Sequence, residues 1–375
     1  MEGESAKRGG EETVKSWAPL GLLAGLLALL LWLGGQGAAA PVAAAPQASA
    51  VPAASGQPER VFVRLSAGTE RERAEAQAEE ADAEPEMELA VYLAQEDRLS
   101  VMGLEDFVRH AVAGEMPASF APEALKAQAV AARSYALWKS ALFGGGGCSQ
   151  RTGADVCTDS GHCMAYADES SLRQSWGEDY QENWAAVCRA VEETKGLVCA
   201  YDGEPIQALF HAVSGGRTED AVAVFQNALP YLTSVESQGE EGAAEYRAEL
   251  FFSGAELAQR LNAAFPGAGL DPAKLPQQLE LLSRTDSGRV EELRLGARTA
   301  TGRQLRQALG LNSTNFSLSF EDGGVRIQTL GYGHGVGMSQ VGANAMAQEG
   351  ADFAQILTHY YQGVSIVPAA SLLGD

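Results

Sequence analysis

Hydrophobic and polar positions change their period within the first third of this chain. Residues 60–67 and 87–94 alternate, which predicts two half-buried strands. From residue 104 onward the apolar positions share one helical face, at Leu104, Phe107, Val108, Ala111 and Val112. The pattern therefore predicts strands followed by a helix, which Met116 and Pro117 bring to an end.

The rest of the chain mixes helical and strand periods. Pro122 and Glu123 are typical of a first helical turn and begin a second helix. Downstream, the pattern predicts helices at 183–196, 253–265, 339–350 and 352–361, a hairpin at 197–216 that turns at Asp202-Gly203, a strand at 290–297 and a strand pair around 322–324. Because no βαβ rhythm is present, we expect an α+β fold of mixed helices and antiparallel hairpins in one elongated catalytic domain, with residues 240–310 as a subdomain or insertion.

An uninterrupted apolar segment occupies residues 17–35. A helix of that length spans roughly 28 Å, close to the ~30 Å hydrocarbon thickness of a bilayer. Lys7, Arg8 and Lys15 precede the segment and no basic residue follows until Arg60, which favours a cytoplasmic N-terminus. We expect a single transmembrane anchor, and the alternative is a cleaved signal peptide, because Ala-x-Ala sites follow the segment.

Both alternatives export the remainder of the chain. Residues 1–16 are then a cytoplasmic N-terminus, residues 36–58 an Ala- and Pro-rich linker, and residues 59–375 an extracytoplasmic domain. The expected location is the cell membrane, crossed once, with the catalytic domain outside.

The charge balance excludes one class of partner. The formal net charge is -22, with 49 acidic against 27 basic residues, and no basic stripe is present. Since neutralising phosphates requires clustered Lys and Arg, we expect no nucleic-acid partner. Part of the excess lies in the acidic run at 69–88, for which the sequence indicates no function.

A cluster of thiols and one imidazole indicates a metal site. Cys148, Cys157, His162 and Cys163 lie within sixteen positions of one another, and thiolates with imidazole at short spacing suit tetrahedral Zn²⁺. A disulfide of Cys148 with Cys157 or Cys163 is the alternative in an exported protein. Cys188 and Cys199 are interpreted as buried small residues or as a second disulfide.

Four segments together carry a resemblance to a known family. They are "GEMPASFAPEALKAQAVAARSYAL" at 114–137, "DVCTDSGHCMAY" at 155–166, "FHAVSGGRTED" at 210–220 and "GYGHGVGMSQVGANAMA" at 331–347. In this order they resemble the SpoIID/LytB family over most of residues 58–366. The resemblance implies a membrane-anchored lytic transglycosylase that cleaves the glycan strands of peptidoglycan during sporulation engulfment, alongside a cell-wall amidase.

The resemblance also implies roles for individual residues. Glu115 becomes the catalytic acid and Arg133 the residue that orients it or grips the substrate. Clostridial members of the family bind zinc near the active site through Cys and His of this segment, which matches Cys157, His162 and Cys163 and leaves Cys148 as the less certain fourth ligand. Residues interpreted as substrate-binding are Gln128, His211, Ser214, His334, Ser339, Gln340 and Tyr360, although Tyr360 fits core packing equally well.

The chemistry of glycosidic cleavage agrees with a role for Glu115. An ordinary glycosidase needs two carboxyl groups. Apart from Glu219 and Asp220, which follow the SGGRT turn, no acid of the matching segments is taken as a candidate for the second. We therefore expect a mechanism in which one Glu acts as acid and then as base while the 6-hydroxyl of the sugar attacks. Holding a proton near neutral pH requires a raised pKa, for which Met116, Pro117 and Phe120 could supply an apolar wall.

Two other functions remain open from the sequence. A related branch of the family consists of amidase enhancers, so the chain could be a non-catalytic peptidoglycan-binding module that stimulates a partner amidase. A zinc hydrolase would need the metal for activity. Because the single-acid chemistry needs no metal-bound hydroxide, we expect the zinc to be structural.

Overall fold

The computed structural model describes residues 87–225 and 228–373. The predicted anchor at 17–35, the linker at 36–58 and the strand at 60–67 lie outside the described residues, as does almost all of the acidic run. Within these ranges no helix combines the length and apolar character that crossing a membrane requires.

The described chain starts with a small sheet and two helices, and it contains the strand predicted at 87–94 and both predicted helices. Strand β1 (Glu88–Leu93) pairs antiparallel with β2 (Arg98–Gly103) and parallel with the short β3 (Val156–Cys157). Helix α3 (Leu104–Glu115) follows directly, and α4 (Pro122–Lys139) begins with its proline in the first turn. The link between the two helices is therefore only six residues long.

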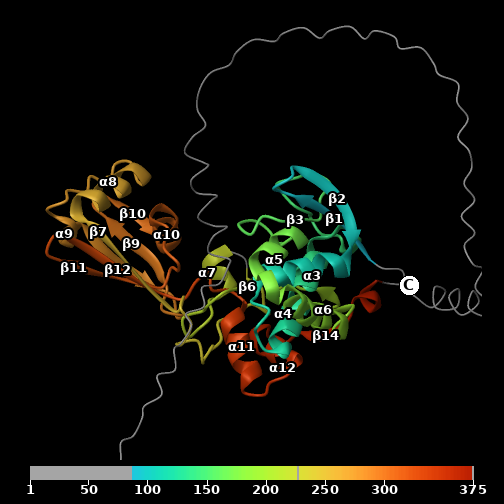
Figure 1. The fold of residues 1–375 in the computed structure, drawn as a ribbon. Coiled ribbons are helices and arrows are strands. Elements are labelled where there is room, and N and C mark those ends of the chain that lie inside the picture. The colour runs from blue at the N-terminus through green and yellow to red at the C-terminus, as the bar shows by residue number, and fades with distance from the viewer. Residues whose placement is uncertain (1–86, 226–227, 374–375) are drawn as a thin grey trace, which may run out of the picture. The chain divides into compact units, whose positions relative to one another are not determined.

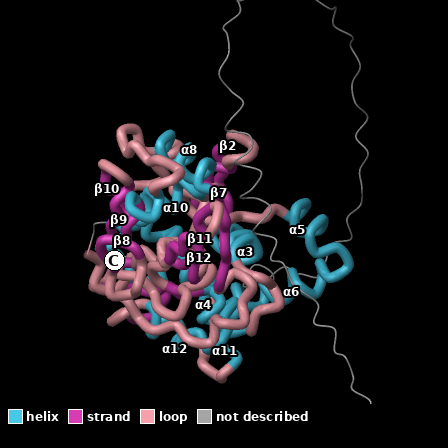
Figure 2. Tube along the Cα trace, turned by 90° about the vertical axis from the view of Figure 1, so that its left-hand side faces the viewer, coloured by secondary structure: helices cyan, strands magenta, loops and turns pink. Residues whose placement is uncertain are grey.

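Helix α4 is the centre of the larger group of helices (Figures 1 and 2). Almost every residue from Ala124 to Leu137 is buried. Its neighbours are α3 together with α6 (Tyr180–Glu193), β4 (Leu197–Tyr201), α11 (Gln340–Gln348) and α12 (Phe353–Tyr360). The alanines of α4 keep its side chains short on all faces, which allows these elements to approach it closely.

The predicted hairpin at 197–216 is correct only in its first half. Strand β4 turns at Asp202 and Gly203, both in the left-handed region, and pairs with β5 (Glu204–Pro205) for two residues and with β14 (Ser365–Pro368) on its other side. The Ile206 N–H still donates to Cys199 O at 3.1 Å, and the chain then leaves this sheet. Strand β6 (Phe210–His211) instead pairs in parallel with β13 (Met338–Ser339).

Residues 247–330 form two further antiparallel sheets. Their strand orders are β10-β9-β8 and β11-β12-β7. In chain order the elements are β7 (Arg247–Ser253), α8 (Gly254–Ala264), α9 (Leu275–Gln278), β8 (Leu279–Arg284), β9 (Val290–Leu295), β10 (Arg298–Thr301), α10 (Gly302–Leu309), β11 (Phe316–Glu321) and β12 (Gly324–Leu330). A separate hydrophobic core joins these sheets and helices, with members such as Leu257, Leu293 and Phe316.

The remaining elements are short: η1 (Ala141–Phe143), α5 (Glu169–Trp176), η2 (Gly177–Asp179), α7 (Ala221–Phe225) and η3 (Ala369–Leu372). The mixture of helices with mainly antiparallel sheets confirms the α+β class.

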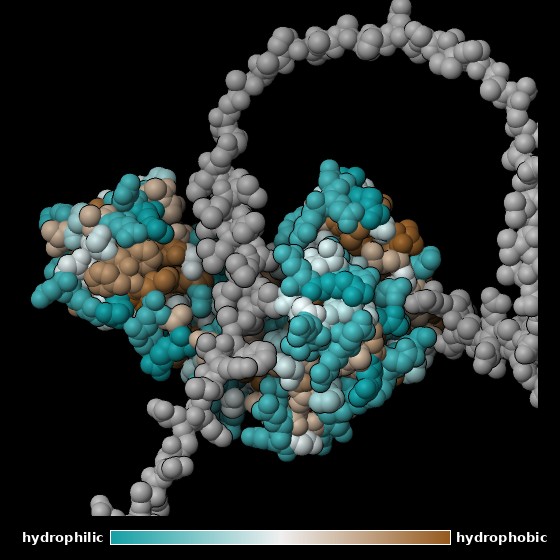
Figure 3. Space-filling model, viewed as in Figure 1, coloured by the Kyte–Doolittle hydropathy of each residue, from teal (hydrophilic) through white to brown (hydrophobic). Residues whose placement is uncertain are grey.

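Most of the face seen in Figure 3 is hydrophilic, with apolar patches near the β1–β2 hairpin and over the sheets of residues 247–330. Exposed apolar side chains lie on edge strands, with Leu99 and Val101 on β2 and Leu250 and Phe251 on β7.

Candidate active site and metal centre

Glu115 is the last residue of α3. Met116 turns to an extended conformation while its N–H still donates to Val112 O, so the helix ends directly after the acid. The negative end of the helix dipole disfavours an ionised carboxylate at this position. Of the three expected wall residues, Met116 is buried, Phe120 is half-buried and Pro117 is exposed.

Two neutral donors contact the half-buried Glu115 carboxyl group. The N–H of Ala165 donates to Oε1 at 2.5 Å and the Gln340 amide to Oε2 at 3.4 Å. Burial raises the pKa of Glu115 above its ordinary value, and these two hydrogen bonds act in the opposite direction. No charged side chain of the described residues contributes to the shift. The site therefore favours the protonated acid without requiring a second carboxylate.

The Ala165 amide is held against α3 by its neighbours in the chain. Ala167 donates its N–H to His110 O and accepts from His110 Nδ1, and the Tyr166 ring stacks on the His110 ring. A Cβ on Gly114 would lie 3.0 Å from the Tyr166 nitrogen and 3.1 Å from that of Ala167. Only a glycine before Glu115 lets this segment lie so close to the helix.

Gln340 and Gln128 extend the site behind Glu115. Gln340 is the first residue of α11, and its Nε2 also lies 3.4 Å from Oε1 of the fully buried Gln128. The Nε2 of Gln128 has no partner among the described residues. Of the predicted substrate-binding residues, these two are the ones that the structure brings together with Glu115.

The predicted role of Arg133 is wrong. Its fully buried guanidinium forms two hydrogen bonds with Glu105, at 2.9 and 2.6 Å, and a third with Leu197 O. Glu105 and Glu115 lie at opposite ends of α3, about 15 Å apart along the helix axis. Arg133 lies on α4, and its hydrogen bonds connect that helix to α3 and β4. Its guanidinium does not reach the carboxyl group of Glu115.

We expect Glu105→Gln to destabilise the protein by about 3–5 kcal/mol, because it leaves the Arg133 charge buried without its partner. Urea unfolding measures the loss. The matched control is Glu169→Gln, which breaks the exposed pair with Arg173 and should cost less than ~1 kcal/mol. Equal effects of the two substitutions would contradict the structural role.

Three predicted substrate-binding residues are enclosed in the interior. Ser214, Ser339 and Tyr360 are fully buried and belong to one hydrogen-bond network around the fully buried Glu240. Tyr360 offers no ring face for a sugar, because its hydroxyl bonds to Ser237 inside the core. The prediction that these side chains contact substrate is therefore corrected.

His211 and His334 form a pair with ring centroids 5.7 Å apart. His211 is buried and bonds through Nδ1 to Val336 O, while its Nε2 has no partner within the described ranges. His334 Nδ1 accepts from the Val336 N–H, so this nitrogen carries no proton. Burial lowers the pKa of His334 to about 4 and that of His211 well below its ordinary value, so both rings are neutral near pH 7.

The Glu219 carboxylate makes its hydrogen bonds away from Glu115. The buried Glu219 accepts from Thr285 and Ser287 and from the Asp220 N–H. Its carboxylate is thus turned to residues 285–287.

The four predicted metal ligands converge. The donor atoms of Cys148, Cys157, His162 and Cys163 all lie within 4.8 Å of one another. His162 Nδ1 is 3.3–3.5 Å from the three sulfurs, and the Cys148 and Cys163 sulfurs are 4.0 Å apart. A tetrahedral site with Zn–S and Zn–N bonds of ordinary length has ligand–ligand distances of roughly 3.5–3.8 Å. The residues therefore fit a zinc ion.

Further details of the cluster support this fit. The other ring nitrogen of His162 lies 2.8 Å from Ser149 Oγ, a contact of the kind that orients metal-bound histidines. The hydrogen bond between the Cys157 and Cys163 thiols lowers the pKa of Cys163 and raises that of Cys157, so it favours a thiolate at Cys163 only. All five cysteines are free thiols in this structure, so it does not contain the disulfides left open by the sequence. Burial raises the pKa of Cys199 to about 12, in keeping with an inert thiol.

The loop that contains the Cys and His cluster also supplies a hydrogen-bond donor to the acid. Cys163 lies two residues before Ala165, whose N–H donates to Glu115. The cluster also packs against β1 through Tyr92. An ordered cluster therefore fixes the position of the Ala165 N–H, which donates to Glu115.

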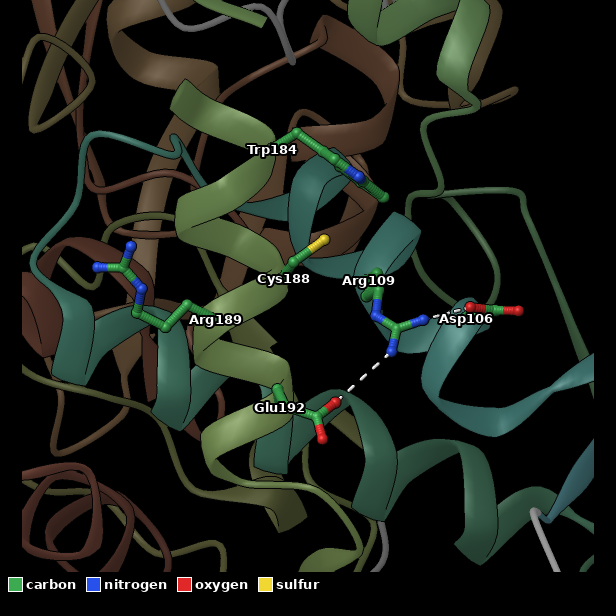
Figure 4. A pocket seen from close by; sticks show the side chains of 6 residues that line it. All are labelled: Asp106, Arg109, Trp184, Cys188, Arg189 and Glu192. Atoms are coloured by element: carbon green, nitrogen blue, oxygen red, sulfur yellow. Dashed lines mark hydrogen bonds and ion pairs between the residues drawn. The ribbon is translucent and has the colours of Figure 1, made fainter. Parts of the chain in front are cut away.

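A separate pocket of about 420 Å³ lies between α3 and α6 (Figure 4). Its lining includes Trp184, Cys188 and Arg109, and Arg109 pairs with Asp106 and, at 3.8 Å, with Glu192. The charge of Arg109 is thus balanced inside the pocket, and Glu115 is not among the lining residues.

The sequence did not predict the Ala165 N–H and Glu240 as parts of this site, nor Glu105 as the partner of Arg133. The only available signal for Glu105 was an acid in the first turn of a helix, which dipole effects explain equally well. Backbone N–H groups carry no residue-specific signal at all. Glu240 lies outside the four matching segments.

Comparison with known proteins identifies a family model and several relatives. The family model described as stage II sporulation protein matches residues 92–201. The chain is 37% identical to stage II sporulation protein D of Bacillus amyloliquefaciens over 287 residues, which cover 76% of this chain and 80% of that protein. The corresponding protein of Bacillus subtilis is 34% identical, covering 76% and 81%. An amidase enhancer of Bacillus subtilis is 25% identical over 68% of this chain and 39% of its own length.

Proposed function

The chain belongs to the SpoIID family of stage II sporulation proteins, and on that premise we propose that it is a lytic transglycosylase that cleaves peptidoglycan glycan strands. The observation that carries the proposal is the Glu115 carboxyl group, whose pKa is raised by burial and whose partners are two neutral donors. Such a group can hold a proton near neutral pH and can also accept one.

In the first step Glu115 donates its proton to the glycosidic oxygen. The bond between that oxygen and the anomeric carbon breaks, and the leaving sugar departs with a free hydroxyl group. The Ala165 N–H and the Gln340 amide then stabilise the carboxylate that Glu115 has become.

In the second step the Glu115 carboxylate removes the proton from the 6-hydroxyl of the sugar that carries the cationic anomeric carbon. The freed oxygen attacks that carbon and closes an intramolecular 1,6-anhydro ring. The proton is back on Glu115, no water is consumed, and no second carboxylate is needed. The Glu219 carboxylate faces residues 285–287, which supports this single-acid scheme.

Mass spectrometry of glycan strands incubated with the purified protein tests the proposal. We expect 1,6-anhydro-muramoyl ends on the products. New reducing ends would show hydrolysis instead and would reject the mechanism, and uncut strands would reject the activity.

The pH profile offers a more specific test through Gln340→Ala. The Gln340 hydrogen bond lowers the pKa of Glu115, so its removal should raise that pKa. Because the first step needs the protonated acid, kcat/KM of the wild type should fall as pH rises above the Glu115 pKa, and the variant should lose activity at a higher pH. Rates at ten or more pH values measure the shift, and a shift to lower pH would contradict the proposed contact.

Cys148, Cys157, His162 and Cys163 would hold zinc as a closed set of four protein ligands. A bound zinc ion of this kind supplies structural stability. The ligand loop itself presents the Ala165 N–H to Glu115.

We also propose that residues 17–35 anchor the protein in the cell membrane, with the domain outside. The partners of the protein would be peptidoglycan and a cell-wall amidase that acts on the same wall during sporulation engulfment.

A second candidate function is stimulation of a partner amidase without bond cleavage, which the similarity to an amidase enhancer favours. It predicts binding to peptidoglycan, faster release of stem peptides by an added amidase and unchanged glycan strand length. Glu115→Gln would then leave the stimulation intact, whereas under the leading proposal it would abolish strand shortening.

A further inference from the structure

Glu240 is the most completely hydrogen-bonded carboxylate of the described chain. It is fully buried, and its two oxygens accept from three serine hydroxyls and the Gly215 N–H. The hydroxyl contacts are Ser214 at 2.8 Å, Ser237 at 2.7 Å and Ser339 at 2.5 Å. No Lys or Arg forms an ion pair with Glu240 within the described ranges.

One of these serines leads directly to the acid. Ser339 is the N-cap of α11, and its hydroxyl accepts the Gly342 N–H at 3.2 Å while it donates to Glu240. The next residue, Gln340, donates to Glu115. A single turn from strand β13 into α11 therefore connects the Glu240 carboxylate to the donor on Glu115.

The packing around this turn leaves no room for a side chain at Gly342. A Cβ on Gly342 would lie 2.2 Å from both Ser237 Oγ and Tyr360 OH and 2.9 Å from Glu240 Oε1. The backbone of α11 thus lies directly on the network. Displacing the Glu240 carboxylate would move the start of α11, and with it Gln340.

We propose that Glu240 is a positioning residue that, through Ser339, holds Gln340 against the carboxyl group of Glu115. This inference rests on the proposed role of Glu115 and extends it to a residue outside the four matching segments. It also explains why Ser214 and Ser339 are enclosed: they bind Glu240 from two segments that are 125 positions apart in the chain.

A carboxylate suits this position better than an amide. Every group that contacts Glu240 is used here as a donor, and an ionised carboxylate accepts at both oxygens. In Glu240→Gln, an NH₂ group would replace one of the two carboxylate oxygens. The groups that donate to that oxygen would then face another donor. The hydroxyls can rotate, but the Gly215 N–H cannot.

The test uses the full-length protein and two readouts. The first is the pKa of Glu115, from a carbon-13 titration of labelled glutamate in which the Glu115 signal is assigned by its absence from Glu115→Gln. The second is kcat and KM for glycan strand cleavage. We expect Glu240→Gln to move the Glu115 pKa upward, as Gln340→Ala does, to lower kcat about tenfold and to leave KM within about twofold.

The double variant Glu240→Gln, Gln340→Ala should show no further shift beyond Gln340→Ala alone, because both changes remove the same contact. Glu219→Gln is the matched control: it alters another buried carboxylate with hydroxyl donors and should leave the Glu115 titration unchanged. A folded Glu240→Gln variant with an unshifted Glu115 pKa would overturn the inference, as would an equal shift in the control.

If circular dichroism shows that Glu240→Gln does not fold, Ser339→Ala gives the answer, since it removes only the connecting hydroxyl. The same upward shift is expected, and an unchanged titration overturns the inference. The titration does not depend on activity. If the wild type does not cleave strands, the proposed function is rejected, but the titration still shows whether Glu240 positions Gln340.

Discussion

Glu115→Gln should lower strand cleavage by a factor of about 10² to 10⁴ while the protein remains folded. The amide keeps the shape of the side chain and can still accept the Ala165 N–H, but it can neither donate a proton to the glycosidic oxygen nor remove one from the 6-hydroxyl. Counting 1,6-anhydro ends per unit time measures the loss. Glu123→Gln, which changes an acid on the following helix, is the control and should retain at least half of the activity.

Turnover of Glu115→Gln at the wild-type rate would reject Glu115 as the acid. Loss of activity together with loss of the folded state would leave the rate difference uninterpretable, so unfolding must be measured on the same preparation. The wild-type structure argues against such a loss, since neither contact of Glu115 involves an ion pair.

The same substitution should change how stability depends on pH. Burial raises the pKa of Glu115 in the folded state, so the folded protein binds more protons than the unfolded chain at pH values between the two pKa values. The stabilisation that Glu115 contributes is fully present below its pKa in the unfolded chain. It is lost as the pH rises through its pKa in the folded protein. Glu115→Gln should therefore gain stability relative to the wild type as pH rises, which urea unfolding at several pH values can detect.

Loss of a metal from the Cys and His cluster should strongly destabilise the folded protein. If the Cys and His cluster binds zinc, chelation or Cys157→Ser should lower the free energy of unfolding by at least ~3 kcal/mol, because binding to a site that exists only in the folded chain contributes directly to folding. Cleavage should fall as well, since the loop that contains Cys163 also presents the Ala165 N–H to Glu115. Elemental analysis should find about one zinc ion per wild-type chain.

Cys188→Ser is the matched control for this experiment. Cys188 is a free thiol on α6 outside the cluster, and its loss should leave zinc content unchanged. Full stability and full cleavage in a metal-free preparation would show that the cluster needs no ion.

Residues with a local pattern could be predicted from the sequence. Helices α3 and α4, strand β1 and the turn at Asp202-Gly203 follow from apolar periodicity, a proline in a first turn and turn chemistry. These signals are local because they depend on neighbouring residues only. The hairpin at 197–216 could not be predicted in full, since β6 has its partner more than 120 residues away.

The residues of the candidate site also fall into those with a local sequence signal and those whose partners are distant in the chain. Residue type and spacing alone placed Glu115 at a helix end and predicted one cluster of Cys148, Cys157, His162 and Cys163, whose donor atoms do converge. Only the tertiary structure decided which side chains face the acid: it turned Arg133 to Glu105 and enclosed Ser339 against Glu240. The physical reason is that a buried polar group binds whichever partner the packing brings within reach, and that partner can come from any distance along the chain.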